Sequence, residues 1–200
     1  MKNVLVITAS IFGQDGQSSQ LVDRTLQQLR DSHGDIKVQH RDLAAEPVPH
    51  LDAERFGAFV TGAEARDHQQ QAVVDYSDSL IEEVTQADII VLGVPMYNFG
   101  VPSVLKAYFD HIARAGVSFR YTENGPVGLL EDRPVYILAA RGGIYAGTPN
   151  DSQTPFLRSF LGFLGLKDVH FVYAEGLNMG DDHKATALQQ ADRSIATLTA

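Results

Sequence analysis

The sequence contains no cysteine among its 200 residues. A disulfide framework, a thiolate metal site and a cysteine nucleophile are therefore excluded. Positive charge is also scarce: 16 Lys and Arg residues stand against 25 Asp and Glu residues, giving a formal net charge of -9. Such a chain would be repelled by nucleic acid and by anionic membranes at long range, so neither is expected as a partner. A phosphate ligand is still compatible with this charge, because a helix N-terminus binds an anion locally.

The first apolar stretch, Val4 to Ser10, is too short to span a membrane. It opens into a polar loop and then an amphipathic helix from Leu21 to Leu29, which is not the layout of a signal peptide. We therefore expect a cytoplasmic protein whose first strand lies here. With 44% hydrophobic and 20% charged residues, the chain has the balance of a soluble globule. Its length suits a single domain over residues 1–200.

Several catalytic signatures are missing. The seven histidines show no H-x-H or H-E-x-x-H spacing, so no metal site is predicted. No G-x-S-x-G elbow exposes a serine, which makes a hydrolase with Ser10 as nucleophile improbable. No Gly-Lys-Ser/Thr sequence occurs either, which argues against a Walker-type nucleotide loop.

Apolar runs alternate with segments of helical periodicity. The runs at 4–8, 36–41, 89–94, 134–140 and 169–173 predict strands, and the periodic segments at 21–29, 72–85, 104–112, 156–164 and 188–198 predict helices. Such alternation predicts an α/β fold with a parallel, doubly wound sheet. Five strands fit a flavodoxin-like three-layer α/β/α sandwich in the order 2-1-3-4-5.

Local signals refine this outline. Ser18 or Ser19 is expected to cap the first helix, and Pro102 is expected in the first turn of the third. Asn124-Gly125 predicts a tight turn between two short extended pieces. The section from Ala44 to Gln70 is longer than an ordinary connection, which suggests a functional cover or a contact element.

In a sheet of this order the ligand binds beyond the carboxyl ends of the strands, between the first and third strands. The loop after strand one, from Ala9 to Ser19, holds two glycines and three serines and leads into a helix. These groups offer a phosphate several donors, and a phosphomonoester such as FMN fits them better than ATP. An ordinary capped helix start explains the same residues equally well.

The loop after strand three contains Met96, Tyr97, Asn98 and Phe99 between Pro95 and Pro102. A stiff apolar loop with one amide suits an isoalloxazine ring, which needs apolar contact on its faces and polar groups at its pyrimidine edge. The alternative is that these side chains only complete the core. At a predicted ligand-binding edge we favour the site.

The loop after strand four begins Arg141-Gly142-Gly143. Paired glycines allow backbone amides to approach a ligand closely and to stabilise negative charge on a reduced flavin. A plain turn is nearly as good an interpretation. Arg141 is either a surface charge or an electrostatic partner of the flavin, and the sequence leaves both open.

Together these loops resemble those of the FMN-dependent NADH azoreductases, which are grouped with the NAD(P)H:quinone oxidoreductases. The likeness covers essentially the whole chain. The segments that carry it are Pro95–Phe99, Ala113–Val117, Phe119–Pro126, Arg141–Gly143, Phe160–Phe163 and Ala174–Gly176. Each motif is weak alone, and their common order makes the signal specific.

The resemblance implies tightly bound FMN, NADH or NADPH as co-substrate, and a quinone or aromatic azo acceptor reduced by ping-pong hydride transfer through the flavin. It also implies a homodimer with active sites at the subunit interface. The residues implied for the FMN phosphate are Ser10, Gly16, Gln17 and Ser18; for the ring, Pro95, Met96, Tyr97, Asn98, Phe99, Arg141, Gly142 and Gly143; and for catalysis, Asn98, Tyr121 and Phe163.

Two positions depart from the family pattern. Gly16 and Ala140 stand where family members often have serine, so two hydroxyl contacts to FMN are absent. Two other functions stay open: a flavodoxin-type electron carrier without substrate turnover, and a nucleotide-binding regulator with a degenerate site. The length of the chain and its long section from Ala44 to Gln70 favour the enzyme over the carrier.

Overall fold

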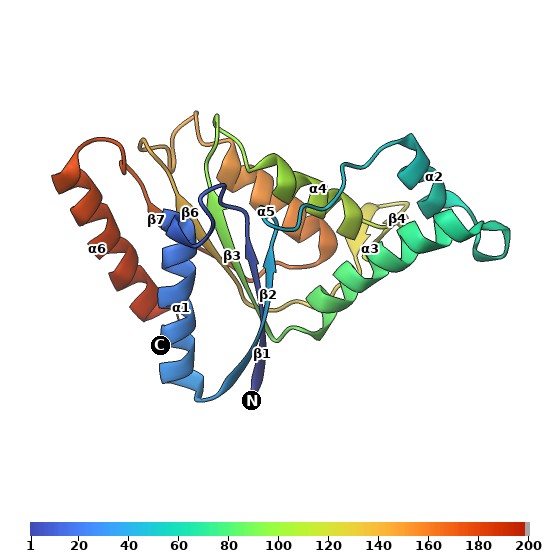
Figure 1. Cartoon of the computed structure of the whole chain (residues 1–200), viewed down its shortest axis with the longest axis horizontal. Coiled ribbons are helices and arrows are strands. Elements are labelled where there is room, and N and C mark those ends of the chain that lie inside the picture. The colour runs from blue at the N-terminus through green and yellow to red at the C-terminus, as the bar shows by residue number, and fades with distance from the viewer. Residues whose placement is uncertain (199–200) are drawn as a thin grey trace.

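A computed structural model describes residues 1–198, with a parallel sheet between two layers of helices (Figure 1). The sheet strands are β1 (Lys2–Thr8), β2 (Ile36–Asp42), β3 (Ile89–Pro95), β6 (Val135–Ala140) and β7 (Val169–Ala174). Their order, β2-β1-β3-β6-β7, with every pairing parallel, confirms the predicted flavodoxin-like order 2-1-3-4-5. The predicted domain of residues 1–200 includes Thr199 and Ala200, which lie outside the described residues.

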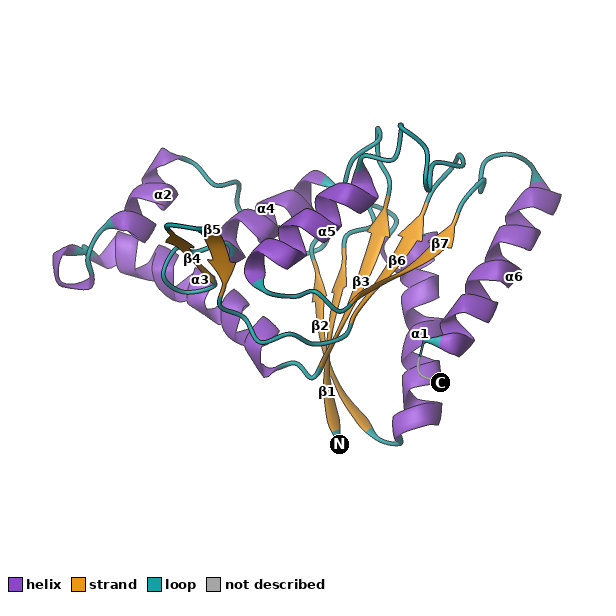
Figure 2. Cartoon of the chain, turned by 180° about the vertical axis from the view of Figure 1, so that it is seen from behind, coloured by secondary structure: helices purple, strands orange, loops and turns teal. Residues whose placement is uncertain are grey.

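The helices divide between the two faces of the sheet. They are α1 (Gln17–His33), α2 (Ala53–Val60), α3 (His68–Gln86), α4 (Ser103–Ile112), α5 (Gln153–Leu164) and α6 (Asp181–Thr197). Helices α1 and α6 lie together on one face, and α3, α4 and α5 cover the other (Figures 1 and 2). Within residues 1–198, no helix is both long and apolar enough to cross a membrane.

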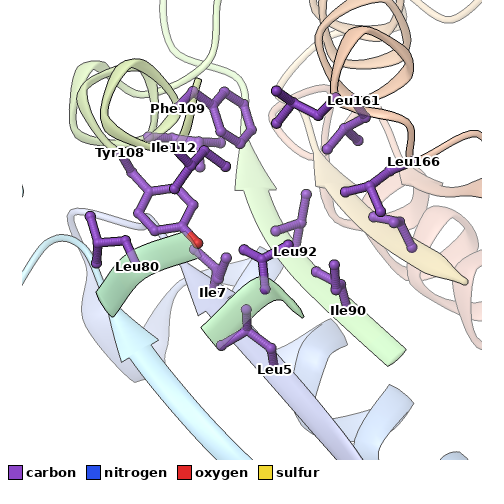
Figure 3. Packing of buried hydrophobic residues seen from close by; sticks show 14 of the residues in the cluster. Leu5, Ile7, Leu80, Ile90, Leu92, Tyr108, Phe109, Ile112, Leu161 and Leu166 are labelled. Carbon is purple, nitrogen blue, oxygen red and sulfur yellow. The ribbon is translucent and has the colours of Figure 1, made fainter. Parts of the chain in front are cut away.

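Both faces of each central strand are buried, which explains why these strands are continuously apolar. In β1, Leu5 and Ile7 pack with α3, α4 and α5, whereas Val4 and Val6 pack with α1 and α6. This alternation follows from the two-residue period of a strand. Figure 3 shows the first of the two cores, where Tyr108 of α4 lies close to Ile7 and Leu80. Each fully buried leucine contributes about 1.5–3 kcal/mol through the hydrophobic effect.

The start of α1 differs from the prediction. Gly16 is the N-cap residue, and both Ser18 and Ser19 lie inside the first turn, so neither caps the helix. The Ser19 hydroxyl instead donates to Gly13 O at 2.7 Å. Gly16 takes the capping position because its extended backbone is packed directly against Ser10, where a Cβ would lie 2.1 Å from Ser10 Oγ. Similarly, Pro102 is the N-cap residue of α4, one position before its first turn.

The long section from Ala44 to Gln70 is partly helical. It contains α2, whose first turn is capped by the Asp52 side chain, and a short 3₁₀ turn at Ala63–Ala65. Phe59 of α2 meets the His111 ring edge-on, with 5.7 Å between ring centroids, and the Arg114 guanidinium lies over the same Phe59 ring at 4.6 Å. Helix α2 is therefore fixed against α4 and the residues that follow it.

The predicted tight turn between two short extended pieces is confirmed, as a small hairpin of β4 (Phe119–Thr122) and β5 (Gly125–Gly128). Its two turn residues are Glu123 and Asn124, one position earlier than predicted, and Gly125 begins β5 with a φ of 106°. Gly128 packs against the end of α5 so closely that a Cβ there would lie 2.2 Å from Gly165 N. Figure 2 shows the hairpin beside α2 and α3, on the opposite side of the molecule from β7 and α6.

Candidate functional site

The loops that follow β1, β3, β6 and β7 gather at the carboxyl edge of the sheet (Figure 2). The first of them folds into two tight turns, in which Gly13 N donates to Ser10 O at 3.0 Å and Gly16 N donates to Gly13 O at 3.2 Å. Ser10 is only 2% exposed, and its Oγ accepts a hydrogen bond from Phe12 N. These turns place the N-terminus of α1 beside the end of β1.

Two polar atoms at the start of α1 are buried without a partner among the described residues: Ser18 Oγ and Gln17 Oε1. Buried polar groups are costly unless they are hydrogen-bonded. Rotation of the Gln17 amide by 180° would present Nε2 in place of Oε1, and the Ser18 hydroxyl is itself a donor. With the unpaired N–H groups of the first helical turn, these side chains form a set of donors suited to a phosphate.

The loop after β3 contains a strained turn. Tyr97 and Gly100 exchange two backbone hydrogen bonds, of 3.1 and 3.0 Å, across Asn98 and Phe99. Both central residues have positive φ, 49° for Asn98 and 66° for Phe99, and this region is unfavourable for a bulky residue such as Phe. The turn is held because Ser152 Oγ donates to Phe99 O. It presents the side chains of Asn98 and Phe99 to solvent.

Tyr97 connects this turn to the β1 loop. Its hydroxyl accepts a hydrogen bond from Ile11 N at 3.2 Å. The exposed Phe99 ring meets Tyr145 edge-on, with 5.5 Å between centroids. The structure therefore brings together predicted residues of the loops after β1 and β3. It adds Tyr145 of the loop after β6, which the sequence analysis did not identify.

The two glycines of the loop after β6 lie close to the ends of two side chains. A Cβ at Gly142 would lie 2.5 Å from Asn178 Nδ2, and one at Gly143 would lie 2.7 Å from the Tyr145 hydroxyl. Their carbonyls accept hydrogen bonds from Asn178 N at 3.0 Å and from Gly176 N at 2.9 Å. The peptide planes of this loop are thus fixed by the loop after β7.

Arg141 is not a surface charge, because it is 1% exposed. Its guanidinium donates to Gln153 Oε1 (3.2 Å), Thr154 Oγ1 (2.9 Å) and Glu175 Oε1 (3.0 Å), and pairs with Asp151 Oδ2 (3.2 Å). Burial alone would raise the pKa of Asp151, but hydrogen bonds from Thr154 and Arg141 outweigh it and hold that pKa below its ordinary value. The sequence analysis did not identify Asp151 or Gln153 and gave Glu175 no role, because no periodic signal marks a buried polar cluster.

Tyr121 and Phe163 lie elsewhere in the chain. They flank Phe119, with ring centroids 5.4 and 4.2 Å from it. Phe163 is ten residues along α5 from Gln153, which contacts the β3 loop, so about 15 Å of helix separates Phe163 from that loop. A single chain therefore does not bring these two aromatic residues next to Asn98.

Comparison with known proteins agrees with this geometry. The family model for the flavodoxin-like fold matches residues 2–198. The FMN-dependent NADH:quinone oxidoreductase of Cellvibrio japonicus is 58% identical over 198 residues, covering 98% of this chain and 100% of that protein. The protein of the same name from Alcanivorax borkumensis is 55% identical over 197 residues, covering 98% of this chain and 100% of its own length.

This chain belongs to the FMN-dependent NADH:quinone oxidoreductase family.

Solved structures extend the likeness to azoreductases. The azoreductase of Bacillus anthracis str. Sterne superposes with a TM-score of 0.89 at 27% identity, covering 100% of this chain and 99% of that one. An FMN-dependent NADH-azoreductase from Bacillus anthracis str. Ames Ancestor, solved in complex with FMN, gives a TM-score of 0.89 at 26% identity, with coverage of 100% and 98%.

The structure shows what the serine that the resemblance implies at position 16 would require. A Cβ at Gly16 would lie 2.1 Å from Ser10 Oγ and 2.7 Å from Ser10 Cβ, so a serine there requires Ser10 to move. In this chain the Ser10 hydroxyl fills the space that a side chain at position 16 would take. Ala140, the other position at which the resemblance implies a serine, is a buried residue at the end of β6.

Proposed function

We propose that this chain binds FMN tightly and uses NADH or NADPH to reduce quinones, aromatic azo compounds or both. One observation carries the proposal: the unpartnered Ser18 hydroxyl at the N-terminus of α1 lies at the same sheet edge as the Asn98-Phe99 turn and the Gly142-Gly143 loop. The names of the relatives, which are 50–58% identical oxidoreductases, favour an enzyme over an electron carrier.

The residues present fit FMN. Ser18, Gln17 and the first N–H groups of α1 would hold the phosphate, with Ser10 and Gly16 forming the wall of the turn behind it. When bound, the flavin supplies the redox chemistry by accepting a hydride equivalent from a nicotinamide and passing electrons to the acceptor. The chain itself binds and orients the reactants.

The ring would lie between two loops. Pro95, Met96, Tyr97, Asn98 and Phe99 would contact it from the β3 side, and the backbone of Arg141, Gly142 and Gly143 would meet its pyrimidine edge from the β6 side. Asn98, held at the tip of its turn with positive φ, would present its amide to the ring. No side chain need act as an obligate acid or base.

The acceptor pocket would be completed by a second copy of the chain. Tyr121 is 74% exposed and Phe163 is half-buried. Phe163 lies about 15 Å along α5 from the β3 loop, and Tyr121 of β4 meets the same Phe119 ring as Phe163. A homodimer in which one protomer contributes Asn98 and its partner contributes these aromatic rings would bring the three catalytic candidates together. The negative charge of the chain is consistent with a cytoplasmic enzyme of one domain, acting on small molecules.

An absorbance titration tests the proposal. Purified protein is incubated with FMN, desalted and followed anaerobically while NADH is added. We expect an oxidised-flavin spectrum that NADH bleaches and that returns when a quinone or azo dye is added. Retained flavin that NADH cannot bleach would indicate the electron carrier, and protein that retains no flavin would refute the proposal.

A further inference from the structure

All three guanidinium nitrogens of the buried Arg141 contact protein partners. Its Nε donates to Gln153, its Nη2 to Thr154, and its Nη1 lies within 3.2 Å of both Asp151 and Glu175. The ring of Tyr173 lies beneath the guanidinium at 4.8 Å. All three guanidinium nitrogens have a protein partner and the residue is only 1% exposed, so the guanidinium is not presented to a ligand from solvent.

One partner of Arg141 reaches the β3 loop. Gln153 accepts from Arg141 through Oε1 and donates through Nε2 to Pro95 O at 3.0 Å and to Gly100 O at 3.4 Å. These two carbonyls stand on either side of the Met96–Phe99 segment. Because an amide has one acceptor end and one donor end, the Arg141 contact sets which end of Gln153 faces those carbonyls.

A second partner reaches the loop after Gly142-Gly143. Glu175 Oε1 accepts from Arg141 Nη1 at 3.0 Å and also from Tyr145 N and Ala146 N, both at 2.9 Å. Tyr145 in turn carries the ring that meets Phe99. One buried guanidinium is therefore linked, through one intermediate residue on each side, to both loops that flank the predicted ring position.

We propose that Arg141 is a positioning residue that sets the spacing of the Met96–Phe99 and Gly142–Ala146 loops through Gln153 and Glu175, without touching the flavin. The inference rests on the proposed FMN site. It replaces the expectation of a direct arginine–flavin contact by an indirect one. The two carboxylates against one guanidinium also leave the cluster with a formal charge of -1.

Three variants separate this role from its alternatives. Arg141→Lys keeps the charge and loses the planar fork that reaches several partners at once. Gln153→Ala keeps Arg141 with its Thr154, Asp151 and Glu175 contacts, and removes the chain of hydrogen bonds from Arg141 Nε to Pro95 O and Gly100 O. Arg133→Lys is the matched control, because Arg133 precedes β6 at its amino end, about 25 Å from Arg141 along the strand. Its guanidinium binds the carbonyls of residues 84, 85 and 87.

FMN affinity, the visible circular dichroism of bound FMN and the melting temperature are measured for each protein. We expect Arg141→Lys and Gln153→Ala each to weaken FMN binding about tenfold and to change the flavin dichroism. Arg133→Lys should lower the melting temperature and leave both flavin signals unchanged. Gln153→Ala removes no charge, so it tests the positioning role of Arg141 even if Arg141→Lys fails to fold.

A flavin signal altered in Arg141→Lys but unchanged in Gln153→Ala would overturn the proposal, since the arginine would then act directly. If wild-type protein retains no FMN, the proposed function fails, and hydrogen exchange of the flavin-free chain decides the inference alone. Faster exchange at Tyr145 and Ala146 in Arg141→Lys, and in residues 96–100 in Gln153→Ala, would support the positioning role. Exchange at the wild-type rate would refute it.

Discussion

Replacing Gly128 by alanine should loosen the hairpin that carries Tyr121. The new Cβ would lie 2.2 Å from Gly165 N and from Leu164 C, and 2.5 Å from Gly165 Cα. All three are backbone atoms at the end of α5, so the overlap cannot be relieved by a side-chain rotation. Overpacking of this kind costs about 2 kcal/mol. For a chain of this length, that loss lowers the melting temperature by about 4–8 °C.

Thermal unfolding and steady-state kinetics check this prediction together. Because the hairpin lies away from the α1 N-terminus, the Gly128→Ala protein should retain FMN while its KM for the acceptor rises. Gly57→Ala is the control: Gly57 is inside α2 with no atom within 4 Å of the added Cβ, so stability should increase by about 0.5–1 kcal/mol. An unchanged melting temperature for Gly128→Ala would show that the hairpin moves aside at no cost and would refute the reasoning.

Three further changes give distinct results. Ser18→Ala should weaken FMN binding about tenfold and leave the flavin-free protein at least as stable as wild type, because the hydroxyl that it removes is buried without a partner among the described residues. Calorimetry measures the FMN affinity and the thermal stability. Asn98→Ala should slow flavin reduction by NADH more than it lowers stability. Asn98→Gly also lacks the amide but tolerates the positive φ, so it controls for backbone strain in the alanine variant. Unchanged turnover would remove Asn98 from the mechanism. Burial, and next the charge of Arg55, lower the pKa of His111 in the fold. The unfolded chain therefore binds the proton first, and the free energy of unfolding should fall as the pH drops below 6.5; urea titrations of His111→Gln should lack this slope.

The fold was readable from the sequence because its signals are local. A strand buried on both faces must be apolar at every position, and Ile89 to Val94 meets that condition without a break. Helix α2 was not recognised. Its eight residues include Gly57 at the centre and follow two prolines, so propensity argued against a helix that contacts with His111 and Arg114 stabilise.

The site was readable in part for the same reason. The loops at the carboxyl ends of β1, β3 and β6 follow from strand order alone, so Ser18, Asn98 and Gly142 could be located. The cluster around Arg141 could not be predicted, because Gln153 and Glu175 meet it across 12 and 34 residues of sequence. Nor could the capping role of Gly16, which depends on the close approach of Ser10.

Within one chain, Asn98 lies far from Tyr121 and Phe163, the two aromatic residues that flank Phe119, and this separation has a genetic consequence. If each pocket takes Asn98 from one protomer and Tyr121 from its partner, two inactive alleles should complement each other when expressed together. In a dimer of an Asn98→Ala chain with a Tyr121→Ala chain, one pocket inherits both defects and the other inherits neither. Random pairing makes half of all dimers mixed, and one of the two pockets in each mixed dimer is intact. Co-expression of the two inactive variants should therefore restore about a quarter of wild-type activity.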